Sequence, residues 1–117
     1  MGQESELKHY RVCKVTDMED CDVLKIEPPG LRPVAVYRLD GEFYATDDTC
    51  THGNASLADG EVEEDGVVEC PFHAGTFDVR TGEALSFPCV LPLKTYPVVV
   101  EDGTVYVDLE HGELPEG

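Results

Sequence analysis

The chain has 117 residues, which suits one domain with a modest core, and 41% of them are hydrophobic, which excludes a disordered tail. Its 25 acidic residues against 8 basic ones give a formal net charge of −17, so nucleic acid and anionic membranes are poor partners and a basic protein surface is a good one. No apolar run approaches the roughly 18 residues of a membrane span, and "MGQESELKHY" lacks the apolar core of a signal peptide, so we expect a cytoplasmic protein.

Short runs of alternating, β-branched and aromatic residues predict strands along the chain. These runs are Tyr10–Val15, Val23–Glu27, Val34–Leu39, Glu42–Asp47, Val67–Cys70, Tyr96–Val100 and Thr104–Leu109. The pairs Asp40-Gly41, Asp65-Gly66, Thr81-Gly82 and Asp102-Gly103 predict tight turns between them. No stretch keeps a helical period over ten or more residues, and Met18–Asp22 predicts one helical turn at most. The sequence therefore predicts an all-β sandwich or small barrel.

Two segments are predicted to be irregular within a single domain that covers residues 1–117. Ser86–Pro97 contains three prolines, and because proline cannot donate to a strand ladder we expect a fixed loop there. The acidic residues of about 110–117 predict a frayed C-terminal tail.

Two short pieces of sequence bring together side chains that can bind a metal. The pattern is Cys50-x-His52, a gap of 17 residues, and then Cys70-x-x-His73. Both pieces lie between predicted strands, so these side chains would sit on loops of a rigid scaffold. The chain has five cysteines, an odd number that disfavours a disulfide scaffold and favours metal binding or catalysis.

The distribution of the ligands separates two kinds of metal site. Zinc fingers usually pair Cys with Cys and His with His, so that each short turn clamps one ion. Here each loop supplies one Cys and one His, which suits a centre with one iron held by two thiolates and another held by two imidazoles. That is the ligand set of a Rieske [2Fe–2S] centre. A structural zinc site in an interaction module remains the competing interpretation.

The stretch "CTHGNASLADGEVEEDGVVECPFHAGTFDVRTGEAL" resembles the Rieske ferredoxins of bacterial ring-hydroxylating dioxygenase systems, and "LPLKTYPV" resembles their return to the basal sheet. The resemblance covers about residues 10–109. It implies a Rieske fold, with a basal β-sandwich or small barrel and a cluster-binding subdomain at about residues 46–88. It also implies one [2Fe–2S] cluster per chain, bound by Cys50, His52, Cys70 and His73. Cys50 would hold the inner iron and His52 the outer one, while Gly53 would allow a tight turn.

The resemblance implies that the chain is a one-electron carrier and not an enzyme. The donor would be an NADH-dependent flavoprotein ferredoxin reductase, and the acceptor would be a terminal oxygenase that dihydroxylates an aromatic ring. We expect a monomer. Two related functions stay open, namely the small subunit of a nitrite reductase and a carrier for a Rieske monooxygenase.

Four positions distinguish this chain from the respiratory Rieske proteins. Ala55 and Phe72 stand where those proteins have the cysteines of a disulfide that joins the two loops. Gly75 and Phe77 stand where they have a Ser and a Tyr whose hydroxyls donate to cluster and ligand sulfur. With fewer donors to stabilise the reduced cluster, we expect a reduction potential toward the low end of the Rieske range of about −150 to +300 mV.

The remaining candidates have simpler interpretations. Cys13, Cys21 and Cys89 are expected to pack rather than to bind metal, and His9 and His111 are expected at the surface. Phe72, between two ligands, is a candidate docking contact. The stretch Asp59–Glu69 holds six carboxylates and no basic residue. It is either a solvated surface loop or a surface that steers a basic partner.

Overall fold

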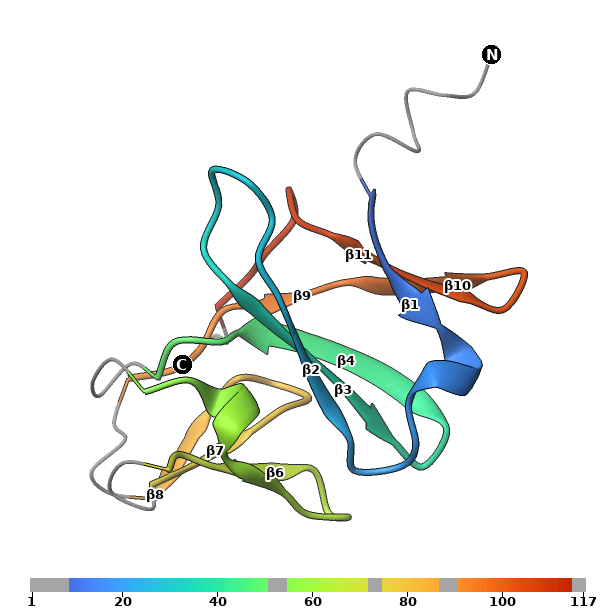
Figure 1. Cartoon of the computed structure of the whole chain (residues 1–117). Coiled ribbons are helices and arrows are strands. Elements are labelled where there is room, and N and C mark those ends of the chain that lie inside the picture. Colours follow the sequence, from blue (N-terminus) through green and yellow to red (C-terminus); the bar gives the residue numbers. More distant parts are fainter. Residues whose placement is uncertain (1–8, 51–54, 72–74, 87–90, 115–117) are drawn as a thin grey trace.

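The computed structural model describes residues 9–50, 55–71, 75–86 and 91–114. Within these ranges the chain forms short strands and two 3₁₀ helices (Figure 1). The strands are β1 His9–Lys14, β2 Val23–Ile26, β3 Val34–Leu39, β4 Glu42–Asp47, β5 Glu61–Val62, β6 Val67–Glu69, β7 Thr76–Asp78, β8 Ala84–Ser86, β9 Thr95–Tyr96, β10 Val98–Glu101 and β11 Thr104–Asp108. The helices are η1 Val15–Asp17 and η2 Leu57–Asp59, and no helix in the described ranges is long and apolar enough to cross a membrane.

The strands form three antiparallel sheets, as Figure 1 shows. The first has the order β1-β11-β10, the second β2-β3-β4-β9 and the third β5-β6-β7-β8. The first two are the basal sheets, and β9 and β10 pass from one to the other across Pro97. The prediction of an all-β fold is confirmed.

Strand β3 separates two hydrophobic cores because both of its faces are buried. Val34 and Val36 face a core that they share with Val105 and Val107 of β11. The alternate residues of β3 face the opposite way, as the period of two along a strand requires. Those residues are Ala35, Tyr37 and Leu39, and they belong to a second core with residues of the third sheet. The second sheet is therefore the middle sheet of the fold, with the first sheet packed on one face and the third sheet on the other.

The two hairpin turns predicted in the basal sheets are confirmed. Asp40 and Gly41 have φ values of 51° and 83°, and Asp102 and Gly103 have values of 50° and 75°. Positive φ at both central residues is the type I′ turn, whose twist matches the flanking strands.

The predicted strands at Val34–Leu39 and Glu42–Asp47 agree with β3 and β4 residue for residue. The predicted loop Ser86–Pro97 is wrong at its two ends, because Ser86 closes β8 and Thr95–Tyr96 form β9. Pro97 instead interrupts the predicted strand Tyr96–Val100, since it has no N–H to donate.

The single helical turn of the N-terminal region lies at Val15–Asp17 and not at Met18–Asp22. The Lys14 N–H donates to a carboxylate oxygen of Asp17 (3.0 Å), and this local bond favours the turn three residues earlier than predicted.

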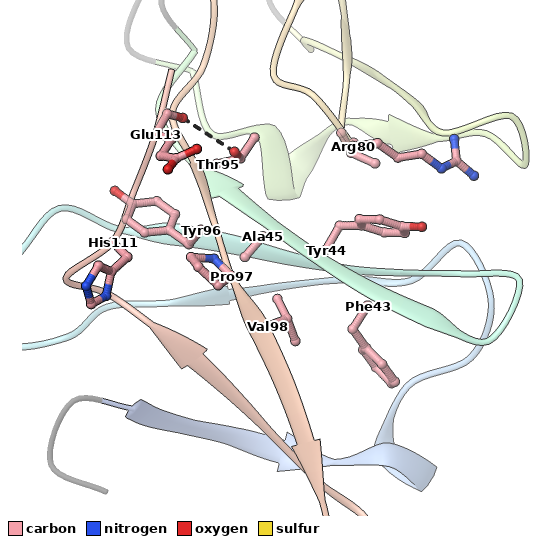
Figure 2. A pocket seen from close by; sticks show the side chains of 11 residues that line it. Phe43, Tyr44, Ala45, Arg80, Thr95, Tyr96, Pro97, Val98, His111 and Glu113 are labelled. Carbon is pink, nitrogen blue, oxygen red and sulfur yellow. Dashed lines mark hydrogen bonds between the residues drawn. The ribbon is translucent and has the colours of Figure 1, made fainter. Parts of the chain in front are cut away.

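The C-terminal segment is paired up to Glu113, which differs from the predicted frayed tail. Thr95 and Glu113 each donate a backbone N–H to the other's carbonyl, both at 2.8 Å. Figure 2 shows Glu113 beside Thr95, with His111 on the same side of β9. Residues 115–117 lie outside the described ranges.

Candidate metal centre

Cys50 and Cys70 follow two strands that run toward the same side of the molecule. Cys50 comes three residues after β4, and Cys70 comes directly after β6. In Figure 1 both strands run toward the left of the view. Each cysteine lies at the start of a loop that joins two paired segments. The fold therefore places both cysteines in one region of the molecule.

The two cysteines occupy equivalent positions at the tips of two hairpins. Thr49 pairs with Ser56 in one hairpin, and Glu69 pairs with Thr76 in the other. One residue farther along, the Cys50 N–H donates to the Ala55 carbonyl (2.9 Å) and the Cys70 N–H donates to the Gly75 carbonyl (2.8 Å). Both loops are therefore closed by the same backbone bond, from a residue to the fifth residue after it.

Both thiols are buried in the core between the middle and third sheets. Cys50 is 2% exposed and Cys70 is 1% exposed, and they share this core with Phe77 of β7 and with Val79, which follows that strand. The two thiols therefore belong to one apolar core that excludes water, and each lies at the start of a loop that carries a histidine. This donor set fits a [2Fe–2S] cluster with mixed Cys and His ligation.

His52 and His73 lie outside the described residues, as do Gly53, Phe72 and Cys89. The predicted ligand set is therefore placed only at its two cysteines, and the histidine ligands stay a prediction. Among the described residues no three His, Cys, Asp or Glu side chains form a metal-binding group.

The last residues of β4 and the segment after it are fixed by side-chain hydrogen bonds. Thr46 bonds the Tyr37 hydroxyl within the middle sheet (2.9 Å), and Asp47 accepts a hydrogen bond from the Tyr96 hydroxyl of β9 (2.6 Å). Asp48 alone turns toward the cysteine loop, where it accepts hydrogen bonds from Ser56 and from the backbone N–H of Ala58. Sequence reasoning missed this carboxylate, because no spacing rule distinguishes it from Asp47.

A close backbone contact holds the two cysteine hairpins together. Gly60 follows η2, and a Cβ atom built on it would lie 1.9 Å from the carbonyl oxygen of Glu69 and 3.3 Å from the ring of Pro71. Those two residues flank Cys70. The absence of a side chain at Gly60 therefore allows the end of the first hairpin to pack on the start of the second loop.

The other described cysteines and His111 have the packing or surface roles predicted for them. Cys13 lies in the core beside β11, where burial raises the pKa of its thiol and Asp17 raises it further. Partial burial raises the pKa of Cys21, and the carboxylates of Glu64 and Asp20 add to the rise. Raised pKa values disfavour the thiolate that binds metal. His111 is exposed and bonds Asp108 through Nδ1 (2.7 Å).

A separate pocket of about 350 Å³ lies beside β4, β9 and β10. Figure 2 shows its lining residues, which include Tyr44, Tyr96 and His111 but neither Cys50 nor Cys70. The Arg80 guanidinium lies over the Tyr44 ring, 5.4 Å from its centroid. The pocket is therefore distinct from the site formed by the cysteine loops.

The chain is similar to known proteins over most of its length. A family model described as the Rieske [2Fe-2S] domain matches residues 8–97. The 3-phenylpropionate/cinnamic acid dioxygenase ferredoxin subunit of Photorhabdus laumondii is 48% identical over 96 residues, which cover 82% of this chain and 90% of the relative. Ferredoxin CarAc of Metapseudomonas resinovorans is 48% identical over 97 residues, covering 83% of this chain and 90% of the relative.

A solved structure shows the same fold. It is described as a complex of reduced oxygenase and oxidized ferredoxin in carbazole 1,9a-dioxygenase, and it matches with a TM-score of 0.87 and 45% identity over 92% of this chain and 97% of the matched chain. The match to the family model, the identity to two ferredoxins and the two buried cysteines at equivalent loops lead to one conclusion: the chain belongs to the Rieske [2Fe–2S] domain family, and its cofactor is a [2Fe–2S] cluster.

Proposed function

We propose that this chain carries single electrons from a flavoprotein ferredoxin reductase to the terminal oxygenase of an aromatic-ring dioxygenase system. The carrier site is a cluster held by Cys50, His52, Cys70 and His73. The observation that supports it most directly is the burial of two thiols at equivalent hairpin tips, in a chain nearly half identical to dioxygenase ferredoxins.

The cluster supplies one-electron oxidation and reduction, at a potential raised by the replacement of two thiolates with imidazoles. The chain's own residues bury the two thiols, close each loop with a backbone bond and keep water from the cysteine side of the site. A rigid site of this kind suits electron transfer, because the protein rearranges little when the charge changes.

The similarity to dioxygenase ferredoxins supports the choice of partners. The matched structure is described as a complex between oxygenase and ferredoxin, and we propose the same kind of acceptor here. The reductase donor is inferred from the family resemblance. An electron carrier acts on no organic substrate, so the aromatic compound is chosen by the oxygenase.

We also propose that residues 1–117 form a single domain, with residues 46–88 as its cluster-binding subdomain. The third sheet, η2, Cys50 and Cys70 fall within the latter range, which supports these bounds. That the protein is a cytoplasmic monomer is a further prediction from its sequence.

The first test is the purified protein itself. We expect a red-brown protein that contains iron and acid-labile sulfide in equal amounts, with the electron paramagnetic resonance spectrum of a Rieske centre after reduction. Cys50→Ser and Cys70→Ser should each lose the cluster, while Cys13→Ser, which alters a buried cysteine of the other core, should keep it. A colourless protein with stoichiometric zinc would overturn the proposal.

The second test is reconstitution with candidate reductases and oxygenases. Product should form only when reductase, this protein and oxygenase are all present, and the Cys70→Ser protein should not support it. A loaded, reducible protein that supports no aromatic dioxygenase, but does support a nitrite reductase or a monooxygenase, would assign the carrier to that system instead.

A further inference from the structure

Asp48 carries a carboxylate that is buried, which is unusual for a charged side chain. The residue is only 1% exposed, and it lies two residues before Cys50, which belongs to a hydrophobic core. A buried charge costs folding free energy unless it is paired and hydrogen-bonded. The contacts of Asp48 show what this carboxylate does in the fold.

The Asp48 carboxylate bridges to the far side of the first cysteine hairpin. Its Oδ2 accepts a hydrogen bond from the Ser56 hydroxyl (2.5 Å), and its Oδ1 accepts one from the Ala58 N–H (2.9 Å). The Lys25 ammonium of β2 lies 3.8 Å from Oδ2 and provides an opposite charge. Both oxygens are therefore occupied, as a buried carboxylate requires.

The backbone of Asp48 is anchored at the same place. Its N–H donates to the Pro33 carbonyl (3.0 Å), and its carbonyl accepts from the Leu57 N–H (2.8 Å). The pairing of Thr49 with Ser56 and the bond from Cys50 to Ala55 complete the ladder at the base of the loop. The carboxylate adds two side-chain hydrogen bonds across this ladder, from the segment that leads directly to Cys50.

We propose that Asp48 is a positioning residue for the cluster: its carboxylate braces the loop that carries Cys50 and His52, and its buried negative charge lowers the reduction potential. The first role follows from the two bonds to Ser56 and Ala58. The second follows because a fixed negative charge two residues from a ligand makes an added electron less favourable. This inference rests on the proposed ligand set and adds a residue that binds neither iron.

A simpler interpretation is that Asp48 only stabilises the short helix η2, which begins at Leu57. That interpretation predicts a lower melting temperature for substitutions, with unchanged iron binding and potential. The positioning role predicts changes in the cluster itself. The two can therefore be separated by measurements on the loaded protein that a purely structural role would leave unaltered.

The experiment compares Asp48→Ala, Asp48→Asn and wild type, each purified with its cluster. Asp48→Ala should lose iron to a chelator about 10-fold faster than wild type, since removal of a residue that supports metal ligands typically lowers metal affinity by at least about 10-fold. Asp48→Asn keeps an acceptor for Ala58 and gains a donor for Ser56, so it should retain iron nearly as well as wild type. Its potential should rise, because the charge is gone.

Asp47→Asn is the matched control, since it removes the same charge one residue away but faces Tyr96 of β9 instead of the loop. It should release iron at the wild-type rate. If circular dichroism shows that Asp48→Ala does not fold, Ser56→Ala tests the positioning role instead. It removes one hydrogen bond to the Asp48 carboxylate and leaves the carboxylate itself in place. This variant should lose iron faster than wild type.

Three results would overturn the positioning role. They are wild-type iron retention and potential in Asp48→Ala, iron loss in Asp48→Asn as fast as in Asp48→Ala, and wild-type iron retention in Ser56→Ala. Failure of the proposed function has a different signature, because the wild-type protein itself would then carry no [2Fe–2S] cluster.

Discussion

Phe77 is a fully buried aromatic residue in the same core as the two cysteines. Gly75, two residues before it, is buried and accepts the backbone bond from Cys70. Neither residue has a side-chain hydroxyl to offer to the cluster. Because the reduced cluster carries more negative charge, donors added here should stabilise it and raise the reduction potential.

We expect Gly75→Ser combined with Phe77→Tyr to raise the potential by roughly 60 to 130 mV for each added hydroxyl that donates to the cluster or a ligand sulfur. A hydrogen bond to a charged group contributes about 1.5 to 3 kcal/mol, and 1.4 kcal/mol corresponds to about 59 mV for one electron. Protein-film voltammetry measures the shift. Phe43→Tyr makes the same chemical change beside the other core and should leave the potential unchanged. An unshifted double variant would contradict this account of the low potential.

The buried hydroxyl of Tyr37 should make the folding stability of the protein depend on pH in alkaline solution. Its ring is fully buried, and burial raises the pKa of its hydroxyl well above the usual value of 10.0. In the unfolded chain this tyrosine ionises near pH 10, while in the folded protein it stays neutral. The unfolded state therefore loses its proton first, so folding stability is full below about pH 10 and falls as the pH rises further.

Urea unfolding at a series of pH values measures this effect. The midpoint should fall above pH 10 in the wild type, and the fall should be shallower in Tyr37→Phe, which cannot ionise. Tyr37→Phe also loses the hydrogen bond to Thr46, so its midpoint at neutral pH should be lower. Equal alkaline slopes in the two proteins would show that Tyr37 is not the group responsible.

At the scale of elements, the packing of the two cysteine hairpins depends on Gly60. A Cβ at this position would overlap the Glu69 carbonyl oxygen, which is rigid backbone. Gly60→Ala should therefore push η2 away from β6, separate the two cysteine loops and reduce the iron content of the purified protein. Iron and sulfide analysis, together with visible absorption, measures the loss.

Gly30→Ala provides the control for this prediction. A Cβ at Gly30 would meet nothing within 4 Å, but its φ of 75° is unfavourable for alanine. This variant should lose stability by about 1 kcal/mol while keeping its cluster. Full iron content in Gly60→Ala would mean that close packing of the two cysteine hairpins at Gly60 is not needed for cluster binding.

The elements that were predictable from sequence are those whose signal is local. β3 and β4 are long, rich in β-branched and aromatic residues, and joined by Asp40-Gly41, so their bounds follow from propensity and turn chemistry alone. β5, β7 and β8 are two or three residues long and exist because each pairs with its neighbouring strand in the third sheet. Pairing between segments is a tertiary property, and no period is visible in so few residues.

The same distinction holds for the site at the scale of the whole molecule. Cys50 and Cys70 stand out in the sequence because their spacing to histidine is a chemical pattern. Asp48 and Gly60 do not, since their roles arise from contacts with Ser56 and Glu69 that exist only in the folded chain. Sequence thus identifies the ligands of a metal centre more readily than the residues that hold those ligands in place.

Folding brings acidic residues from distant parts of the sequence together near the turn between β5 and β6. In the stretch Asp59–Glu69, the carboxylates of Glu63, Glu64 and Asp65 are exposed at the turn between β5 and β6. Asp20 and Asp40, from distant turns, line a pocket together with Glu64. This surface lies at the start of β6, whereas Cys70 lies at its end. A basic partner would therefore be drawn toward the molecule by a field that extends beyond the cluster loops.

We expect electron transfer to a partner with a basic docking face to slow as salt is added, because exposed charges are screened over about 10 Å at 0.1 M. Stopped-flow reduction at several ionic strengths measures this dependence. Glu63→Lys with Glu64→Lys should lower both the rate at low salt and its salt dependence. The same reversal at Glu101 and Asp102, which are exposed on the β10–β11 hairpin of the first sheet, should have a smaller effect. Equal effects of the two reversals would mean that net charge alone guides association, and rates independent of salt would mean that charge does not guide it at all.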